Sequence, residues 1–276
     1  MSILHAIVLG LVQGLTEFLP VSSSGHLILT PWLFGWNDLN DVAIERAFDA
    51  SLHLGTLIAV LFYLHADLVP YVREGVKVVV SPKRANMVVG RRAWLFVLSA
   101  VPAGIVGAVA EDWIVEKLGT PALIAISLMA FGAVLVWADR QHGTRNIDSF
   151  TTRDALLIGA AQVLALNPGT SRSGITITAA RKFGYSRDAA ARISFLMSVP
   201  VIGGAVLLKM TKLATDGIPD GLMLPMMVGI VTAGVSGWLA MWGMIRLLRT
   251  RSFTPFVLYR FAVGIGVLSI LATSFR

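Results

Sequence analysis

The feature that most constrains this fold is an apolar stretch, interrupted by proline and polar residues, that occurs twice. Residues 10–27 read GLVQGLTEFLPVSSSGHL and residues 159–176 read GAAQVLALNPGTSRSGIT. At an offset of 149 residues identical residues coincide, among them Gly10 with Gly159, Gln13 with Gln162, and Gly25 with Gly174. Each copy predicts an apolar half-helix, a break near proline, a serine-rich turn and a second half-helix.

The composition assigns these stretches to a membrane. Hydrophobic residues make up 55% of the 276 residues and charged residues only 14%, which excludes an ordinary soluble domain and predicts an integral membrane protein. The net charge of +7 comes from basic residues in short loops between apolar segments, so nucleic acid is not an expected partner. The absence of cysteine excludes disulfides and thiolate metal sites. No cleavable signal peptide is expected, because the first apolar segment lacks a basic region before it.

Apolar segments of suitable length predict six transmembrane helices, at about 48–65, 93–110, 121–138, 191–208, 222–245 and 256–274. The half-helices within 2–34 and 154–180 are too short to cross and predict two re-entrant hairpins. Between the segments, the polar stretch at about 66–92 is predicted to be a cytoplasmic loop, as is the last basic loop with Arg246, Arg249 and Arg251. The predicted fold class is therefore an all-α integral membrane protein.

Six crossings place both termini on one side, and the basic loops predict that this side is outside. The first hairpin then enters from outside and the second from the cytoplasm, which is typical of an inverted-topology repeat with a polar site near the midplane. The expected arrangement is one membrane domain, residues 1–276, with repeat 1 at about 2–110 and repeat 2 at about 154–245.

Two polar residues of the first hairpin, Gln13 and Glu17, are four residues apart and share a helix face. A carboxyl group inside a membrane segment is a functional candidate, because burying it without a partner is costly. Glu17 suits a metal ligand or a proton-transfer group, and Gln13 a weak ligand. The alternative is a structural hydrogen bond between the hairpins.

The turn that follows contains Ser22, Ser23 and Ser24 and then His26. Serine is a preferred N-cap residue, so capping accounts for one or two of these side chains. A helix N-terminus also binds phosphate, and His26 lies three residues after Ser23, on the same helix face. The Ser23 and His26 pair near Glu17 therefore favours nucleophilic and general acid/base chemistry.

The matching turn of the second hairpin carries an arginine among small and hydroxyl residues: Gly169, Thr170, Ser171, Arg172 and Ser173. Arg172 at a half-helix N-terminus predicts bidentate binding of phosphate oxygens, although a surface cation placed by the positive-inside rule is the alternative. The two turns together predict a site for a phosphorylated substrate in a membrane.

Four motifs then resemble one known family along essentially the whole chain: QGLTEFLPVSSSGHL, FDASLHLGTLIAV, NPGTSRSGIT and FTPFVLYR. The sequence is similar to the bacterial undecaprenyl-diphosphate phosphatases, also called bacitracin-resistance proteins. The resemblance implies hydrolysis of undecaprenyl diphosphate to undecaprenyl phosphate and inorganic phosphate, which recycles the lipid carrier for cell-wall synthesis. It also implies a location in the cytoplasmic (inner) membrane, a site open to the extracytoplasmic side and a divalent cation, Mg²⁺ or Ca²⁺. The family's important positions fall on Gln13, Glu17, Ser23, His26 and Arg172 of this chain.

The resulting hypothesis gives each of these residues a role. Arg172 and the half-helix N–H groups hold the diphosphate, and Glu17 with Gln13 binds the cation. Ser23 attacks the terminal phosphorus or orients an attacking water, and His26 moves the proton. Ser22, Ser24, Gly169, Thr170, Ser171 and Ser173 are the expected substrate-binding residues. A lipid-phosphate flippase or anion transporter is the alternative function. The expected partners are the polyprenyl diphosphate substrate and membrane lipids. Helix faces with small residues also allow a homodimer with a second copy of the chain.

Overall fold

Nearly the whole chain forms α-helices, as its long apolar runs require. The computed structural model describes residues 1–39, 41–248 and 250–273. The helices are α1 (Ile3–Phe18), α2 (Ser23–Phe34), α3 (Val42–Tyr63), α4 (His65–Val80), α5 (Met87–Leu118), α6 (Pro121–Asp139), α7 (Thr152–Gln162), α8 (Arg172–Lys182), α9 (Arg187–Asp216), α10 (Met223–Leu248) and α11 (Thr254–Leu271). Three short 3₁₀ helices, η1 (Pro82–Arg84), η2 (Ile147–Ser149) and η3 (Val163–Leu166), join them. Within the described ranges no β-strand forms, which confirms the predicted all-α class.

Five of these helices, α5, α6, α9, α10 and α11, are long and apolar enough to cross a membrane. The remaining predicted crossing, at about 48–65, lies in α3, which meets the same criteria only together with α4, and these two helices are bent by 87°. The protein is therefore an all-α membrane protein whose described residues include five helices that could cross by length and composition, or six if the bent pair forms one span. Of the basic residues expected in the last inner loop, Arg249 lies outside the described residues.

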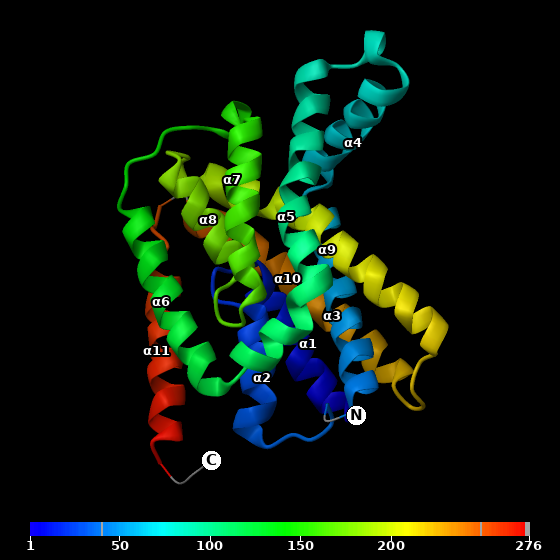
Figure 1. The fold of residues 1–276 in the computed structure, drawn as a ribbon, viewed down its shortest axis with the longest axis vertical. Helices are drawn as coiled ribbons and strands as arrows, with labels where there is room; N and C mark the ends of the chain where they lie inside the picture. The colour runs from blue at the N-terminus through cyan, green and yellow to red at the C-terminus, as the bar shows by residue number, and fades with distance from the viewer. Residues whose placement is uncertain (40, 249, 274–276) are drawn as a thin grey trace.

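The polar stretch at about 66–92 is not the loop that was predicted. It forms α4, η1 and the start of α5, in which most of the basic residues are exposed, whereas Glu74 and Arg92 are buried. Glu74 of α4 is buried and accepts hydrogen bonds from Lys77 Nζ, at 2.9 Å, and from the backbone N–H of Asn86, at 2.8 Å. The bond from Asn86, which caps α5, fixes α4 against the start of α5, and the two helices form the upper end of the molecule in Figure 1.

Both repeated stretches are helices broken at the expected places, α1 and α2 around Pro20 and α7 and α8 around Pro168. The residues that cap α2 and α8, Ser22 and Ser171, have positive φ angles of 77° and 76°. Each serine Oγ accepts a hydrogen bond from the backbone N–H three residues later, at Gly25 and Gly174. Whether the two pairs enter a membrane from opposite sides stays a prediction.

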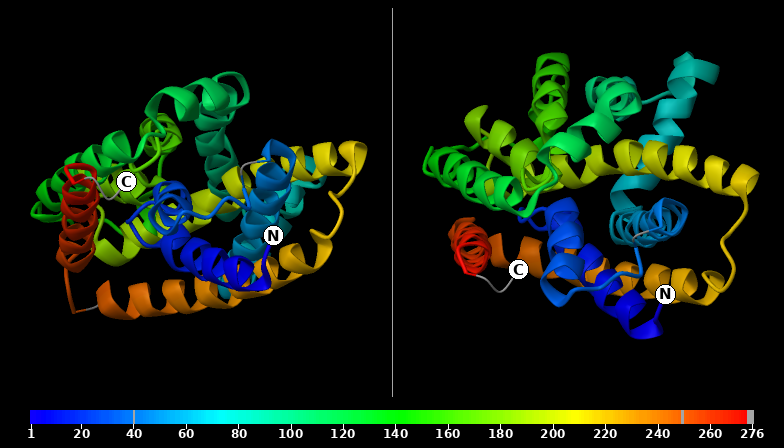
Figure 2. Two further views of the ribbon diagram at one scale, coloured as in Figure 1. Left: turned by 90° about the horizontal axis from the view of Figure 1, so that it is seen from below. Right: turned by 60° about the horizontal axis from the view of Figure 1, so that its bottom comes forward.

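Each broken pair packs against a long helix from the other half of the chain. In Figures 1 and 2, α10 runs along α1, and it also packs on α3, while α5 packs on α7 and α9. The matched glycines permit this approach: a Cβ on Gly10 would lie 1.9 Å from Thr232 Oγ1, and one on Gly159 would lie 2.5 Å from the Ser99 carbonyl oxygen. This packing brings the two serine-rich turns together in the interior.

The first helix begins and the last helix ends at the same end of the molecule. In Figure 1, α1 begins and α11 ends at the lower end, opposite α4 and the start of α5. This arrangement agrees with an even number of crossings. Which end faces outside stays a prediction.

Candidate active site

Glu17, in the last turn of α1, is the centre of a hydrogen-bonded group drawn from three helices. Its Oε2 accepts from Ser23 Oγ, at 2.5 Å, and from Gln13 Nε2, at 3.1 Å. Its Oε1 accepts from Arg172 Nη2, at 3.2 Å. Ser23 and Arg172 are the first residues of α2 and α8, so the two broken helices each deliver one partner to the same carboxylate. The side chains of Glu17 and Arg172 are only 6% and 11% exposed, which strengthens their attraction.

Direct bonds also join the two turns. Ser22 Oγ accepts from the backbone N–H of Gly169 at 3.1 Å, and Ser173 Oγ donates to the carbonyl oxygen of Leu19 at 2.8 Å. Gly169 has a φ of +94°, and a Cβ there would lie 2.7 Å from the carbonyl oxygen of Ile124. Glycine is therefore required where the second turn passes close to α6.

Arg260 of α11 links the same two turns and was not among the predicted residues. Its fully buried guanidinium donates from Nη1 to the Pro20 carbonyl oxygen, at 3.1 Å, and from Nη2 to those of Gly169 and Thr170, at 2.8 and 3.1 Å. Its Nε donates to the Leu128 carbonyl oxygen at 2.7 Å. Its position in the apolar segment 256–274 could have identified it as a functional or structural candidate, because a charged residue inside a membrane needs partners.

His26 lies in α2, three residues after Ser23, but both of its ring nitrogens lie within hydrogen-bond distance of groups other than Ser23. Its Nδ1 donates to the Ser22 carbonyl oxygen at 2.7 Å, since a carbonyl can only accept. Its Nε2 lies 2.8 Å from Tyr259 Oη, and the two rings are stacked. Both ring nitrogens are thus bonded away from Ser23, and the side chain bonded to Ser23 is Glu17. Tyr259, like Arg260, was missed by the sequence interpretation.

Arg172 retains donor capacity for an anion. Its Nη1 donates to the Ser194 carbonyl oxygen at 3.3 Å, and its Nη2 donates to Glu17. Its buried Nε has no hydrogen-bond partner within the part of the chain that the structure describes. A buried donor left without a partner is costly, and a phosphate oxygen is a suitable acceptor.

The predicted cation ligands are adjacent in the structure. Gln13 donates to Glu17, and the buried Gln13 Oε1 has no partner among the described residues. These residues contain no cluster of three or more His, Cys, Asp or Glu side chains that could hold a metal ion. Mg²⁺ requires only one or two protein carboxylates, since water and substrate phosphates supply its other oxygen ligands. One carboxylate with one free amide oxygen therefore fits a cation bound jointly with a phosphate.

With this geometry established, comparison with known proteins gives the family. The family model of the bacitracin resistance protein BacA matches residues 6–266. The chain belongs to the BacA family. An undecaprenyl-diphosphatase of Geobacter sulfurreducens is 45% identical over 98% of this chain and 99% of its own length. Proteins of the same name from Geobacter metallireducens and Hahella chejuensis are 43% and 42% identical, each over 97% of this chain and 98% of their own length.

The remaining predicted residues of this BacA-family protein surround the Glu17 group. Ser22, Thr170, Ser171 and Ser173 are buried, and their hydroxyl groups form bonds within or between the turns. Ser24 is exposed, with its Oγ 3.4 Å from Ser22 Oγ. The structure places all of these residues at the site, and their contact with a substrate stays a prediction.

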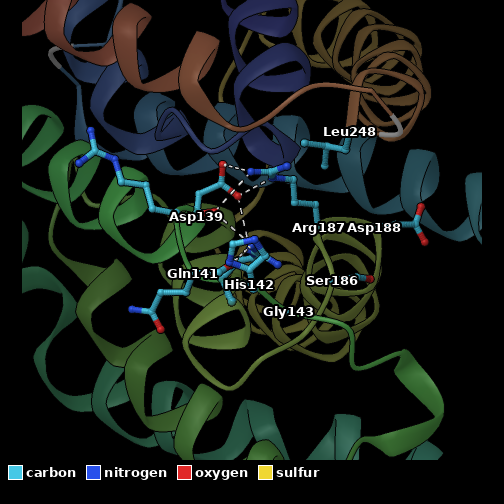
Figure 3. A pocket seen from close by; sticks show the side chains of 10 residues that line it. Asp139, Gln141, His142, Gly143, Ser186, Arg187, Asp188 and Leu248 are labelled. Atoms are coloured by element: carbon cyan, nitrogen blue, oxygen red, sulfur yellow. Dashed lines mark hydrogen bonds and ion pairs between the residues drawn. The ribbon is translucent and has the colours of Figure 1, made fainter.

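A separate cavity of about 580 Å³ lies away from this site and shares none of its residues. Figure 3 shows its lining, in which Asp139 of α6 accepts hydrogen bonds from Arg187 Nε and Nη2, at 2.7 and 3.1 Å. Arg181 donates to the carbonyl oxygens of Asp139 and Gln141, so it satisfies the C-terminal end of α6. These bonds join α6 to α8 and α9, which is a structural role.

Proposed function

We propose that this BacA-family protein hydrolyses undecaprenyl diphosphate to undecaprenyl phosphate and inorganic phosphate. The observation that carries the proposal is the 2.5 Å hydrogen bond from Ser23 to Glu17, beside an arginine with an unpartnered donor. A hydroxyl bonded to a carboxylate is an activated nucleophile, and an arginine next to it can neutralise phosphate charge. The names of the relatives supply the lipid, which the geometry alone does not specify.

In the proposed reaction Ser23 Oγ attacks the terminal phosphorus and gives its proton to Glu17. The bond from this phosphorus to the bridging oxygen breaks, and undecaprenyl phosphate leaves. Glu17 releases its proton to solvent and then deprotonates a water molecule, which attacks the phosphoserine. The bond from phosphorus to Ser23 Oγ breaks, inorganic phosphate leaves, and Ser23 Oγ takes back a proton from Glu17. Direct attack by a water molecule that Ser23 orients is the alternative, and trapping labelled phosphate on the protein distinguishes the two.

Arg172 neutralises charge that spreads over the phosphoryl oxygens, which is the main source of catalysis in phosphoryl transfer. Its free Nε and the backbone N–H groups at the starts of α2 and α8 are donors for the diphosphate. Glu17 and Gln13 would hold a divalent cation, Mg²⁺ or Ca²⁺, which supplies further charge neutralisation when bound.

The proposed location is the bacterial cytoplasmic (inner) membrane, with both termini and the opening of the site on the extracytoplasmic side. The η1 helix, which contains Lys83 and Arg84, joins α4 to α5 at the end of the molecule opposite the start of α1 (Figure 1), and its basic residues support this orientation through the positive-inside rule. The product is the lipid carrier for cell-wall polymers, so its recycling would support peptidoglycan synthesis and cell shape and confer bacitracin resistance.

The test is phosphate release from detergent-solubilised polyprenyl diphosphate by purified wild type, Ser23→Ala and Glu17→Gln, each with and without chelator. We expect both substitutions and chelation to reduce release by at least about 100-fold. Glu116→Gln, which changes an exposed carboxylate of α5, is the matched control and should leave release unchanged. Folded wild type that releases no phosphate but moves lipid phosphate across a bilayer would favour the transporter instead.

A further inference from the structure

His53, in the middle of α3, is a second histidine near the Glu17 carboxylate, and neither the predicted site nor the reaction proposed above uses it. Its Nδ1 donates to the carbonyl oxygen of Asp49 at 2.9 Å and lies 3.2 Å from Asp49 Oδ1. Both atoms are acceptors, so Nδ1 carries a proton and the ring orientation is fixed. The side chain is 22% exposed, so the ring is not enclosed by the protein.

The other ring nitrogen, Nε2, has no hydrogen-bond partner among the residues that the structure describes. His53 is close enough to Glu17 for their charges to interact, but the two side chains form no direct ion pair in the described structure. The opposite holds for His26, whose two nitrogens are both bonded. Of these two histidines, His53 is the one with a free nitrogen beside the reacting carboxylate.

A small ion-pair group holds this ring. Asp49 contacts His53 through Oδ1 and the ammonium group of Lys209, from α9, through Oδ2. In its protonated form the ring has a second N–H, at Nε2, and the Asp49 and Glu17 carboxylates are the neighbours that a cationic ring requires. Lys209 opposes that charge but is itself paired with Asp49.

We propose that His53 binds the terminal phosphate of the substrate, and the inorganic phosphate released from it, by donating a hydrogen bond from Nε2. The inference rests on the proposed phosphatase function. Arg172, from α8, is paired with Glu17 at 3.2 Å, and His53, from α3, interacts electrostatically with the same carboxylate. Cationic groups from two separate helices therefore lie near the carboxylate that is bonded to Ser23. Asp49 is a positioning residue, because it acts only through the imidazole ring.

The test compares His53→Leu and His53→Gln with wild type, with KM for polyprenyl diphosphate and the inhibition constant of inorganic phosphate as the readouts. Loss of one charged hydrogen bond predicts an increase of about tenfold or more in both constants for His53→Leu, with a smaller change in kcat. His53→Gln keeps an N–H donor and should retain most of the affinity. His65→Leu is the matched control, because His65 is exposed on α4 and its Nδ1 also donates to a backbone carbonyl oxygen.

Wild-type constants in His53→Leu would overturn the inference, as would equal losses in His53→Gln and His53→Leu. If His53→Leu does not fold, Asp49→Asn replaces it, because misorienting the ring should also raise the inhibition constant of phosphate, and an unchanged constant would overturn the inference. Thermal stabilisation of each variant by inorganic phosphate measures the same binding without turnover. A wild type that binds inorganic phosphate through His53 but releases none from the lipid would refute the proposed function and leave only the binding of inorganic phosphate by His53 standing.

Discussion

Ser22 and Ser171, which are 149 residues apart, adopt the same strained backbone conformation, with φ angles of 77° and 76°. Positive φ is unfavourable for a residue with a Cβ and costs about 1–2 kcal/mol. Each serine compensates by capping the helix that follows it, through the N–H of Gly25 or Gly174. The two turns therefore present free N–H groups and the side chains of Ser23 and Arg172 in the same way, one from each broken helix.

This compensation predicts an order of stability for substitutions of Ser171. Ser171→Gly loses the cap but removes the strain, whereas Ser171→Ala loses the cap and keeps the strain. We expect Ser171→Ala to be less stable than Ser171→Gly by about 1 kcal/mol, measured as thermal unfolding in detergent. Equal stabilities of the two variants would show that the backbone at this position is not strained.

The sequence predicted the two serine-rich turns and their contribution to one site, because polar residues repeated in an otherwise apolar chain indicate a buried polar site. It also predicted that Glu17, Ser23 and Arg172 belong to one site. It did not reveal that Glu17 is the group bonded to Ser23, since local spacing along α2 placed His26 on the same helix face as Ser23. A helix face limits where a side chain points, whereas its partner depends on packing between helices.

Arg260 and Tyr259 were missed for a related reason. The partners of Arg260 are backbone carbonyl oxygens, at Pro20, Gly169 and Thr170, and carbonyl groups leave no pattern in a sequence. The partner of Tyr259 is His26, 233 residues away. From the sequence alone, the position of Arg260 in an apolar segment indicated that it needs hydrogen-bond acceptors in the interior, but it did not indicate which groups these are.

Arg260 provides the second prediction. We expect Arg260→Lys to lower the free energy of unfolding by about 3 kcal/mol or more, because a single ammonium group cannot reach all the carbonyl oxygens that the guanidinium bonds, and each unsatisfied buried acceptor costs about 1–3 kcal/mol. The measurement is thermal unfolding in detergent. Arg251→Lys changes an exposed arginine and should leave the midpoint unchanged. A midpoint for Arg260→Lys within a degree of wild type would refute the proposed linking role.

The third prediction separates Glu17 from His26 in proton transfer. Removing a general base typically costs a factor of about 10²–10⁴, so Glu17→Gln should reduce kcat by that amount. His26→Gln and Tyr259→Phe should reduce it by less than about tenfold, because the His26 nitrogens bond Ser22 and Tyr259 instead of Ser23. Initial rates of phosphate release measure all three. A loss in His26→Gln as large as that in Glu17→Gln would assign the proton transfer to His26.

The fourth prediction concerns the planar shape of the Arg172 side chain. Arg172 bonds the Ser194 carbonyl oxygen and Glu17 with its two terminal nitrogens and has Nε left for an anion. Lysine keeps the charge but has a single nitrogen, so it cannot orient Glu17 and bind phosphate in the same geometry. We expect Arg172→Lys to reduce kcat/KM for polyprenyl diphosphate by about 100-fold, a loss of about 2.7 kcal/mol of transition-state stabilisation. Arg73→Lys, on the exposed side of α4, is the matched control and should retain full activity. Turnover by Arg172→Lys within a few-fold of wild type would show that charge alone is sufficient, and the binding of phosphate through the planar guanidinium of Arg172 would then have to be abandoned.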